Sequence, residues 1–590
     1  MTSRRYDVVI VGAGVAGALV ASHLTQAGLS VLLLEAGAGS AQALKGYDRH
    51  LQTYFEANGK GPEAPWPASA NAPQPDTANL KFGNGYFVQN GPQLYGSSYT
   101  RLQGGSTLHW LGVSLRMLPE DFAMRGNFGV GLDWPIGYDT LEPYYRQAEL
   151  DMGVSADVAD QAYQGIAFAD GYEYPMARVP LSYSDTWLGD RVNGHRVPIG
   201  DTTAAVQIRS YPAARNSTPR DGYSPFGAVD RRPDGRTRDP FLGGRCQGNT
   251  ACIPICPVQA KYNANRTLAR IDPGLLEIRP RAVASTVDVD ENGVVQSVTY
   301  KRWGGGAVVE EKATARAFVL AAHAVENAKL LLNSGLQTDN GLVGRHLMDH
   351  PTLYAWGLTP EPVWPYRGPQ STAGVEDFRS GAWRARHAAF RFDVGNDGWR
   401  APTGAPEANV SALLEAGAWG ADLRRQLADQ LARQVRFSLA VEQLPDPANR
   451  VTLSRDFLDP LGNPRPVIDY RIDEYTLKAM GEAERVAHAI FEKAGVQDFS
   501  QAPVDKWFPT VPYGDRVFSY HGMGHFAGTH IVGSDASNSV LDHTQRAWAH
   551  PNLYLVGSGS FPTMGTSNPT LTIAATAIRT AHLLAKELGA

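Results

Sequence analysis

A glycine-rich turn between two apolar segments, within the first forty residues, places the strongest constraint on the fold. Residues 6–11 are apolar and β-branched, which predicts a buried strand, and the sequence then turns at Gly12. Helical periodicity follows over 16–26, a second apolar strand over 31–34, and Glu35 closes that strand. This order of strand, turn, helix, strand and acid is the pattern of a dinucleotide-binding unit.

The three glycines of the turn each meet a different steric demand. Gly12 permits the tight turn, Gly14 lets the backbone approach a pyrophosphate, and Gly17 lets the helix pack closely on the strand. The N-terminus of the helix then faces the phosphates, and Glu35 accepts the ribose hydroxyls. The motif does not by itself distinguish FAD from NAD. Its single copy near the start of the sequence favours an FAD around which the rest of the chain is wrapped.

The composition fits a large globular enzyme and excludes several other classes of protein. A chain of 590 residues is too long for one ordinary domain and suits two large ones. The net charge of −5 gives no bulk attraction to nucleic acid or to anionic lipid. No run of about 18 apolar residues occurs, so no membrane span is expected, and the segment before Gly12 lacks the apolar core of an export signal.

All three cysteines of the chain, Cys246, Cys252 and Cys256, fall within one short segment. The odd count and the large size exclude a disulfide framework. Three soft thiolates ending in a Cys-Pro pair favour an iron–sulfur cluster, and three ligands suit the [3Fe–4S] type. A zinc site would usually need a fourth ligand, and the chain has no fourth cysteine. The alternative is three reduced thiols packed in a loop.

The pattern of apolar segments divides the chain into three expected regions. Residues 1–350 are expected to form the first part of an FAD-binding domain, 351–505 a substrate-binding domain, and 506–590 the last part of the FAD-binding domain. Two polar stretches rich in proline, 38–95 and 156–245, predict loop-like excursions from the first region. Further predicted elements are strands around a turn over 277–301, a strand entering a helix over 317–332, helices over 420–434, 477–494 and 571–588, and a strand over 553–556.

Several longer motifs make the chain resemble one known family over nearly its full length. They are GGSTLHW at 104–110, AAHAVENAKLLLNSG at 321–335, LVGRHLMDHP at 342–351, HFAGT at 525–529, NLYLVG at 552–557 and GTSNPTLT at 565–572. Together with the N-terminal turn, they resemble the glucose–methanol–choline (GMC) family of flavin oxidoreductases. Within that family the chain is most similar to catalytic subunits of bacterial fructose and glucose dehydrogenases, and its flavin motifs are also similar to those of pyranose oxidases. The resemblance implies an α/β fold, in which a Rossmann-like FAD-binding domain joins a substrate domain whose antiparallel β-sheet is backed by helices.

The resemblance also implies a pair of residues that act on the substrate. Oxidation of an alcohol by a flavin needs a base for the hydroxyl proton, and histidine suits this step because its pKa lies near neutral pH. His525, in the frame H-x-x-G-T, is implied as the base, and Asn568 as the group that orients the substrate oxygen. His521 is the alternative base, and Asn568 also suits the N-cap of the last predicted helix. Pro569 and Thr570, at the start of that helix, are implied to stabilise negative charge on the reduced flavin.

The remaining flavin contacts are likewise implied by the resemblance. They are Arg101, Gly104, Gly105, Ser106 and His109 in the second glycine-rich loop, Val283 in the predicted strand region, and Gly557 ahead of the last loop. In pyranose oxidases the histidine of this loop is bonded covalently to the flavin. For His109, a covalent bond and non-covalent packing against the flavin are both open.

These inferences predict an FAD-dependent dehydrogenase that oxidises a hydroxyl of a sugar, polyol or glycoside and passes electrons out through the iron–sulfur cluster. The polar, aromatic-rich residues 356–392 suit a sugar, because aromatic rings stack on its apolar faces. A pyranose-type sugar oxidase that reduces dioxygen to hydrogen peroxide is the alternative, and a non-catalytic flavoprotein subunit is a third reading. The resemblance implies a small partner subunit with an export signal, a cytochrome acceptor, and a periplasmic location by co-export, against a cytoplasmic location as the alternative.

Overall fold

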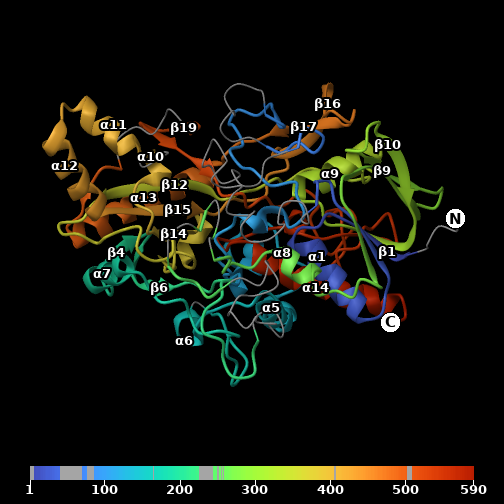
Figure 1. The fold of residues 1–590 in the computed structure, drawn as a ribbon, viewed down its shortest axis with the longest axis horizontal. Helices are drawn as coiled ribbons and strands as arrows, with labels where there is room; N and C mark the ends of the chain where they lie inside the picture. Colours follow the sequence, from blue (N-terminus) through green and yellow to red (C-terminus); the bar gives the residue numbers. More distant parts are fainter. Residues whose placement is uncertain are drawn as a thin grey trace.

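The structure is a computed structural model that describes most of the chain. The described residues are 6–39, 69–75, 85–163, 165–224, 244–248, 252–253, 256, 258–403, 407–500 and 508–590. Much of the expected excursion over 38–95 therefore lies outside the described residues. Figure 1 shows two sheet-based layers side by side, with the strand β1 and its neighbours on the right and the larger antiparallel sheet on the left.

A five-stranded parallel sheet contains the glycine turn predicted from the sequence. In spatial order its strands are β22 (Leu553–Leu555), β11 (Ala315–Leu320), β1 (Tyr6–Val11), β2 (Val31–Leu34) and β7 (Leu276–Arg279). Four of these strands are apolar and largely buried, as expected where helices or other strands cover both faces of a parallel sheet.

The two faces of this sheet are covered by different elements. Val8 and Ile10 of β1 pack with apolar residues of α1 (Val15–Gln26), α8 (Ala264–Leu268) and α14 (Thr570–Glu587). Val9 and Val11 pack instead with residues of the antiparallel strands β8 (Ala282–Val289) and β9 (Val295–Arg302) and of α9 (Ala324–Asn333). The strand β10 (Val309–Ala313) completes the three-stranded sheet of β8 and β9. Helices α1 and α14 lie side by side in Figure 1, so the two ends of the chain build one face together.

Close packing at the glycine turn leaves no room for side chains at two positions. Gly12 has a φ of +103°, and a Cβ there would lie 2.6 Å from the carbonyl oxygen of Ala321. A Cβ on Gly17 would lie 2.0 Å from the carbonyl oxygen of Gly12. Gly14 differs from both, since a Cβ there meets no atom of the described residues within 4 Å. Gly12 and Gly17 therefore serve backbone packing, whereas Gly14 keeps space open at the start of α1.

A second, seven-stranded sheet forms the other large layer. Its strands are β18 (Gln497–Asp498), β12 (Pro351–Leu358), β15 (Gln434–Val441), β14 (Phe390–Gly395), β13 (Ala373–Val375) and β6 (Ile208–Ser210), and β21 (His521–Gly522) pairs with β12. Helix α13 (Glu474–Ala494) packs its apolar residues against Phe437 and Phe392 of this sheet. Helices α10 (Arg400–Thr403), α11 (Glu407–Glu415) and α12 (Gly420–Arg433) extend beyond it on the left of Figure 1.

Shorter elements connect the two layers. They include β16 (Arg450–Leu458), β17 (Pro464–Asp469) and β3 (Val88–Gln89) in one small sheet, the hairpin β19 (Thr510–Tyr513) and β20 (Arg516–Ser519), and helices α4 (Met124–Phe128) and α5 (Tyr138–Met152). Among the described residues, no helix is long and apolar enough to cross a membrane.

The predicted α/β fold is confirmed, and the region over 156–245 contains more regular structure than its composition suggested. It includes α6 (Val158–Gln161), the capped helix α7 (Tyr183–Val192), the hairpin of β4 (Arg196–Ile199) and β5 (Thr202–Ala205), and β6. Strand β6 pairs with β13, so packing against the larger sheet imposes order on a proline-rich segment. Residues 225–243 of this region lie outside the description.

Two alanine substitutions should separate the two kinds of glycine in the turn. We expect Gly17→Ala to lower the free energy of unfolding by about 1–3 kcal/mol, because its Cβ overlaps the backbone of Gly12. Gly14→Ala should leave the stability of the flavin-free protein nearly unchanged and weaken FAD binding. Thermal unfolding of the flavin-free variants and titration with FAD measure the two effects. An equal loss of stability in both variants would contradict this division of roles.

Candidate functional site

One cavity of about 1200 Å³ lies between the parallel sheet and the seven-stranded sheet. Its wall runs from the glycine turn after β1, past the second glycine-rich loop and the start of α9, to the inner ends of β12, β14 and β15. The sequence-predicted residues that line it are Gly12, Gly14, Glu35, Arg101, Gly105, Ser106, His109, His525, Gly557, Asn568, Pro569, Thr570 and the alternative base His521.

Three of the candidate flavin contacts do not line this cavity. Gly17 packs α1 against the turn, and Gly104 holds the second loop with a φ of +103° beside Asn265. Val283 points into a small apolar cluster with Ala72 and Leu461, whereas its strand neighbours Ala282 and Ala284 line the cavity. Because side chains alternate along a strand, position 283 contributes side-chain packing on the opposite face.

The end of the cavity at the glycine turn has the features that a dinucleotide needs. Helix α1 begins next to Gly14, whose backbone caps it without any side-chain hydrogen bond, and Val15 also lines the cavity. The free N–H groups of the first turn and the positive end of the helix dipole therefore face the open space beside Gly14, which the Cβ of any other residue at position 14 would partly fill. These residues fit the pyrophosphate of FAD.

Glu35 lies in the same wall and is held by the backbone around it. Its carboxylate accepts hydrogen bonds from the backbone N–H of Ala13 at 3.0 Å and of Gly37 at 2.7 Å. Burial raises the pKa of Glu35, and these two backbone donors oppose that rise. Glu35 follows β2, the neighbour of β1, and so lies one strand away from the N-terminus of α1. A carboxylate acceptor fixed at this place suits a ribose hydroxyl.

Arg101 forms part of a buried cluster that the sequence did not predict. Its guanidinium lies 3.8 Å from Glu326 at the start of α9, and Lys329 lies 3.7 Å from the same carboxylate. Burial would raise the pKa of Glu326, but the two cations lower it to about 2. Tyr99 donates its hydroxyl to Glu326 at 2.6 Å. The second glycine-rich loop is thereby joined to α9 through a compensated charge cluster.

His109 reaches the cavity wall with one ring nitrogen already engaged. Its Nε2 lies 2.8 Å from the hydroxyl oxygen of Thr100. Burial, with a smaller contribution from the charge of Lys261, lowers the pKa of His109 to about 4, so the ring is neutral at pH 7. The covalent bond between His109 and the flavin stays a prediction.

His525 and Asn568, predicted from motifs 43 residues apart, face each other across the cavity. The Asn568 side-chain N–H₂ donates to Nε2 of His525 at 3.3 Å. Arg391 fixes the amide, because its guanidinium donates to the Asn568 Oδ1 at 2.7 Å. Burial, then the neighbouring His350 and Arg391, lowers the pKa of His525 well below its usual range. His525 is therefore neutral at pH 7 and able to accept a proton.

His350 determines which nitrogen of His525 holds the lone pair. The Nε2 of His350 lies 2.8 Å from the carbonyl oxygen of Gly565, which can only accept, so the proton of neutral His350 is on Nε2. The Nδ1 of His350 must then accept, and it lies 2.8 Å from Nδ1 of His525. Neutral His525 is thus protonated on Nδ1 and presents the Nε2 lone pair to the cavity. Burial lowers the pKa of His350 to about 3, which keeps this arrangement neutral.

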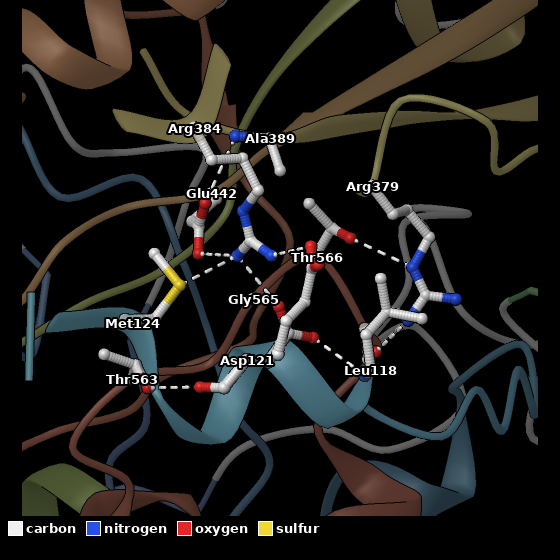
Figure 2. A network of polar contacts seen from close by, with 12 residues as sticks. Leu118, Asp121, Met124, Arg379, Arg384, Ala389, Glu442, Thr563, Gly565 and Thr566 are labelled. Atoms are coloured by element: carbon white, nitrogen blue, oxygen red, sulfur yellow. Dashed lines mark hydrogen bonds and ion pairs between the residues drawn. The ribbon is translucent and has the colours of Figure 1, made fainter. Parts of the chain in front are cut away.

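Buried arginines hold the loop that carries Gly565 and Asn568. Figure 2 shows Arg384 between Glu442 and Asp121, whose carboxylates lie 2.7 and 2.8 Å from its Nη2. Asp121 leaves no space for a side chain at Gly565, since a Cβ there would lie 2.4 Å from a carboxylate oxygen. Arg379 donates to the hydroxyl of Thr566 at 3.2 Å, on the other side of the same loop. The position of the Gly565 carbonyl is therefore fixed from both sides.

The end of the cavity beyond His525 is polar, and its charged groups are paired. Arg436 donates to Asp397 at 2.7 Å, and Arg391 donates to Asp393 at 2.6 Å. Tyr354 of β12 lies beside them. Sequence reasoning missed these residues because they come from separate strands of the larger sheet. His350 had a signal in the motif at 342–351, but its role depends on contact with His525, 175 residues away.

The three cysteines all belong to the described residues and lie outside the cavity wall, although Ile253, next to Cys252, lines it. Burial raises the pKa of Cys246, Arg215 lowers it, and Cys252 and Cys256 raise it further, so their sulfur atoms lie within electrostatic reach. Soft thiols of this kind suit iron–sulfur chemistry. Within the described residues, no group of three or more His, Cys, Asp or Glu side chains is arranged to hold a metal. Residues 249–251, 254–255 and 257 lie outside the description, and the cluster stays a prediction.

Comparison with known proteins identifies relatives that span almost the whole chain. Models of the GMC oxidoreductase family match residues 242–352 and 445–577, and a model of FAD dependent oxidoreductases matches residues 7–73. The chain is 30% identical to the fructose dehydrogenase large subunit of Gluconobacter japonicus, over 99% of this chain and 98% of the relative. It is 28% identical to paromamine 6'-oxidase of Streptomyces fradiae, over 99% and 92%.

Solved structures share the fold at lower identity. The crystal structure of pyridoxine 4-oxidase from Mesorbium loti matches with a TM-score of 0.58 at 18% identity, and the match covers 98% of this chain and 99% of that protein. At this level of identity the likeness concerns the fold alone.

The two-histidine arrangement predicts that His350 sets the tautomer of His525. We expect His350→Leu to remove the acceptor for the Nδ1 proton, so that only the longer contact from the Asn568 amide at 3.3 Å still favours the original tautomer and His525 shifts towards the Nε2-protonated form. His350→Asn, which keeps an acceptor oxygen near the same place, should preserve the original tautomer. Nitrogen NMR of protein labelled at the histidine rings reports the tautomer, with His525→Gln identifying the resonances. An unchanged His525 tautomer in His350→Leu would refute this role.

Proposed function

The chain belongs to the GMC family of FAD-dependent oxidoreductases, and we propose that it is a dehydrogenase that oxidises a hydroxyl group of a sugar, polyol or glycoside to a carbonyl. The observation that carries the proposal is the neutral His525, whose Nε2 lone pair faces Asn568 inside the cavity that begins at the glycine turn. A base and an amide in one cavity with a dinucleotide site suit the removal of a proton and a hydride from the same alcohol.

The roles of the side chains follow from their hydrogen bonds. Nε2 of His525 takes the hydroxyl proton, while the Nδ1 proton of His525 stays bonded to His350. The Asn568 amide, oriented by Arg391, donates to the substrate oxygen and holds the carbon towards the flavin. Bound FAD supplies the acceptor for the hydride at its N5 atom. Thr570 begins α14 at the cavity wall, and the positive end of the helix dipole there favours negative charge.

The substrate class is supported by the cavity and by the relatives. The paired charges of Arg436 with Asp397 and Arg391 with Asp393 leave a polar surface without a strong preference for ionised groups. Fructose dehydrogenase large subunit, paromamine 6'-oxidase and pyranose 2-oxidase are all named for polyhydroxylated molecules or their oxidation. A sugar-like substrate is consistent with both the polar cavity wall and the named relatives.

The route by which electrons leave separates two versions of this function. The cysteine loop touches the flavin side of the cavity, because the ammonium of Lys261 donates to the carbonyl oxygens of Trp110 and Cys252, and Trp110 lines the cavity. This contact supports electron exit through a [3Fe–4S] cluster held by the three cysteines. The alternative is an oxidase that passes electrons to dioxygen, and several relatives are named oxidases.

A partner subunit and a location outside the cytoplasm complete the proposal. The relative from Gluconobacter japonicus is named as a large subunit, which suggests a smaller partner for this chain as well. We propose that the partner carries the export signal, that both reach the periplasm together, and that a cytochrome accepts the electrons. A cytoplasmic location is the alternative, and fractionation of native cells distinguishes the two.

The proposed function predicts flavin reduction by sugars that depends on His525. We expect anaerobic mixing with a panel of sugars, glycosides and polyols to bleach the flavin of the wild type. His525→Ala should keep FAD and reduce flavin about 10²–10⁴-fold more slowly, as expected for loss of a positioned base. His543→Ala, at an exposed position, is the matched control and should behave as the wild type. No bleaching by any member of the panel would disprove the proposed substrate class.

The low pKa of His525 predicts the pH dependence of this step. Because its folded-state pKa lies well below the usual value, the neutral base form is already complete at pH 7. The flavin-reduction rate should rise with pH only on the acid side and stay level from about pH 6 to 9. Stopped-flow measurement across this range tests the expectation, and a rate that climbs steadily through pH 7 would point to a base with an ordinary histidine pKa.

Replacing a cysteine should break electron exit without affecting the flavin chemistry. We expect the wild type to contain about three irons per chain after anaerobic purification, by the ligand count of a three-thiolate cluster. Cys252→Ser should lose the iron and transfer to a cytochrome, yet its flavin should still be reduced by the substrate. Iron analysis and oxygen uptake measure the outcome. Iron-free wild type with fast oxygen turnover would establish the oxidase alternative.

A further inference from the structure

We infer that His521, Gln370 and Ser371 form a hydroxyl-binding subsite at the substrate end of the cavity, which selects uncharged ligands with several free hydroxyl groups. All three residues line the cavity, and each has a buried polar side-chain atom without a hydrogen-bond partner among the described residues: Nε2 of His521, Oε1 of Gln370 and Oγ of Ser371. The inference rests on the proposed function, and it names the chemistry by which that site would recognise its substrate.

The free nitrogen of His521 is an acceptor. Its Nδ1 lies 2.8 Å from the carbonyl oxygen of Gly522, which can only accept, so the proton of the neutral ring is on Nδ1. Burial lowers the pKa of His521 to about 4, which keeps the ring neutral at pH 7. Nε2 therefore presents a lone pair, and a ligand must bring an O–H or N–H group to satisfy it.

The direction of that lone pair is fixed by packing. His521 belongs to β21, which pairs with β12 opposite Thr352. Its ring stacks on Tyr354 with centroids 4.9 Å apart and planes 20° apart, and it lies 5.4 Å from the ring of Phe508. Because backbone and rings hold the imidazole before any ligand arrives, little freedom is lost on binding.

Gln370 offers a second fixed acceptor. Its side-chain N–H₂ donates to Asp397 at 2.9 Å, which leaves Oε1 as the unpartnered atom of the amide. Asp397 also accepts from Arg436 at 2.7 Å, so its charge is balanced and does not itself attract a cation. The backbone carbonyl of Gln370 accepts from Asn396 at 2.8 Å, which anchors the residue beside β14.

Ser371 follows directly and adds a hydroxyl that can donate or accept. Its backbone carbonyl accepts from Arg215 at 2.8 Å, so the peptide from 370 to 371 is held at both residues. The subsite thus contains two obligate acceptors and one adaptable hydroxyl. A sugar or polyol hydroxyl can donate to each acceptor, whereas a carboxylate or a keto group brings acceptors alone and leaves them unsatisfied.

His521 and His525 therefore have different tasks although they lie only four positions apart in the sequence. His525 has its Nε2 next to Asn568, where the reacting hydroxyl would lie, whereas His521 stacks on β12 and binds a hydroxyl away from the reacting carbon. Loss of His521 should weaken substrate binding and leave the limiting rate of flavin reduction nearly unchanged. Loss of His525 should lower the limiting rate itself.

The test uses the holoenzyme and the best sugar from the panel, together with its monodeoxy analogues. We expect His521→Phe, which keeps the stacking but removes the lone pair, to raise the half-saturating sugar concentration about 10- to 100-fold. The deoxy analogue that lacks the hydroxyl bound by His521 should bind the wild type as weakly as the parent sugar binds His521→Phe. The same analogue should bind His521→Phe no more weakly than the parent sugar does. His521→Gln, which restores an acceptor, should recover part of the affinity. In Gln370→Met, removal of a different hydroxyl of the sugar should be the one that causes no further loss of affinity.

Several outcomes would overturn the subsite. If the loss of affinity caused by His521→Phe simply added to the loss caused by removing a hydroxyl, for every deoxy analogue, then His521 would bind no substrate hydroxyl. The same conclusion would follow if His521→Phe strongly lowered the limiting rate of flavin reduction and left the half-saturating concentration unchanged. A lower half-saturating concentration for an aldonic acid than for the matching neutral sugar would show that the cavity wall prefers an anion. Arg400, which lines the cavity, would then supply the positive charge.

A binding measurement keeps this test separate from that of the proposed function. Flavin difference spectra of the oxidised His525→Ala holoenzyme, titrated with the same sugars, report binding without turnover. Binding that weakens in the His525→Ala/His521→Phe double variant supports the subsite even if no sugar reduces the wild-type flavin. Sugars that neither bind nor perturb these spectra would refute the subsite. Flavin content and thermal unfolding confirm that each variant is folded.

Discussion

Charge compensation around three fully buried arginines, Arg379, Arg384 and Arg391, fixes the loop on which the site depends. Arg384 is balanced by Asp121 and Glu442, and Arg391 by Asp393, so none of these groups is free to reorient. The guanidinium groups donate in fixed directions, which sets the loop from Gly565 to Asn568 within narrow limits. Breaking one of these pairs would leave a buried charge without its partner, which is strongly destabilising.

The histidine pair shows how this rigid frame becomes chemistry. Gly565 offers a carbonyl that accepts from His350, and this hydrogen bond, together with the Asn568 amide that donates to Nε2 of His525, decides the proton positions on two rings. Arg391 decides in the same way which end of the Asn568 amide faces His525. Burial keeps both histidines neutral. A base and a donor are thus prepared by groups that never contact the substrate themselves.

Local sequence predicted much of the fold and the principal site residues, whereas contacts between distant segments were beyond it. The roles of Gly12, Gly14 and Gly17 follow from their spacing together with the order of strand, helix, strand and acid around them, all within the first forty residues. His525 and Asn568 were found through family motifs and meet in one cavity. The role of His350 and the subsite at His521 depend on strands that pair only after folding. Their chemistry comes from carbonyl groups and carboxylates that no local pattern reveals.

The burial that prepares His525 also limits how long it can keep what it takes. Because the pKa of His525 is so low, its protonated ring is a strong acid that releases the accepted proton readily, yet its Nδ1 side is closed by His350 and Gly565. The proton must therefore leave from Nε2, through the same opening by which the alcohol entered. Each turnover then requires the oxidised product to depart, or water to reach Nε2, before the base is restored. The burial that keeps the histidine neutral therefore ties recovery of the base to the departure of the product or to the entry of water.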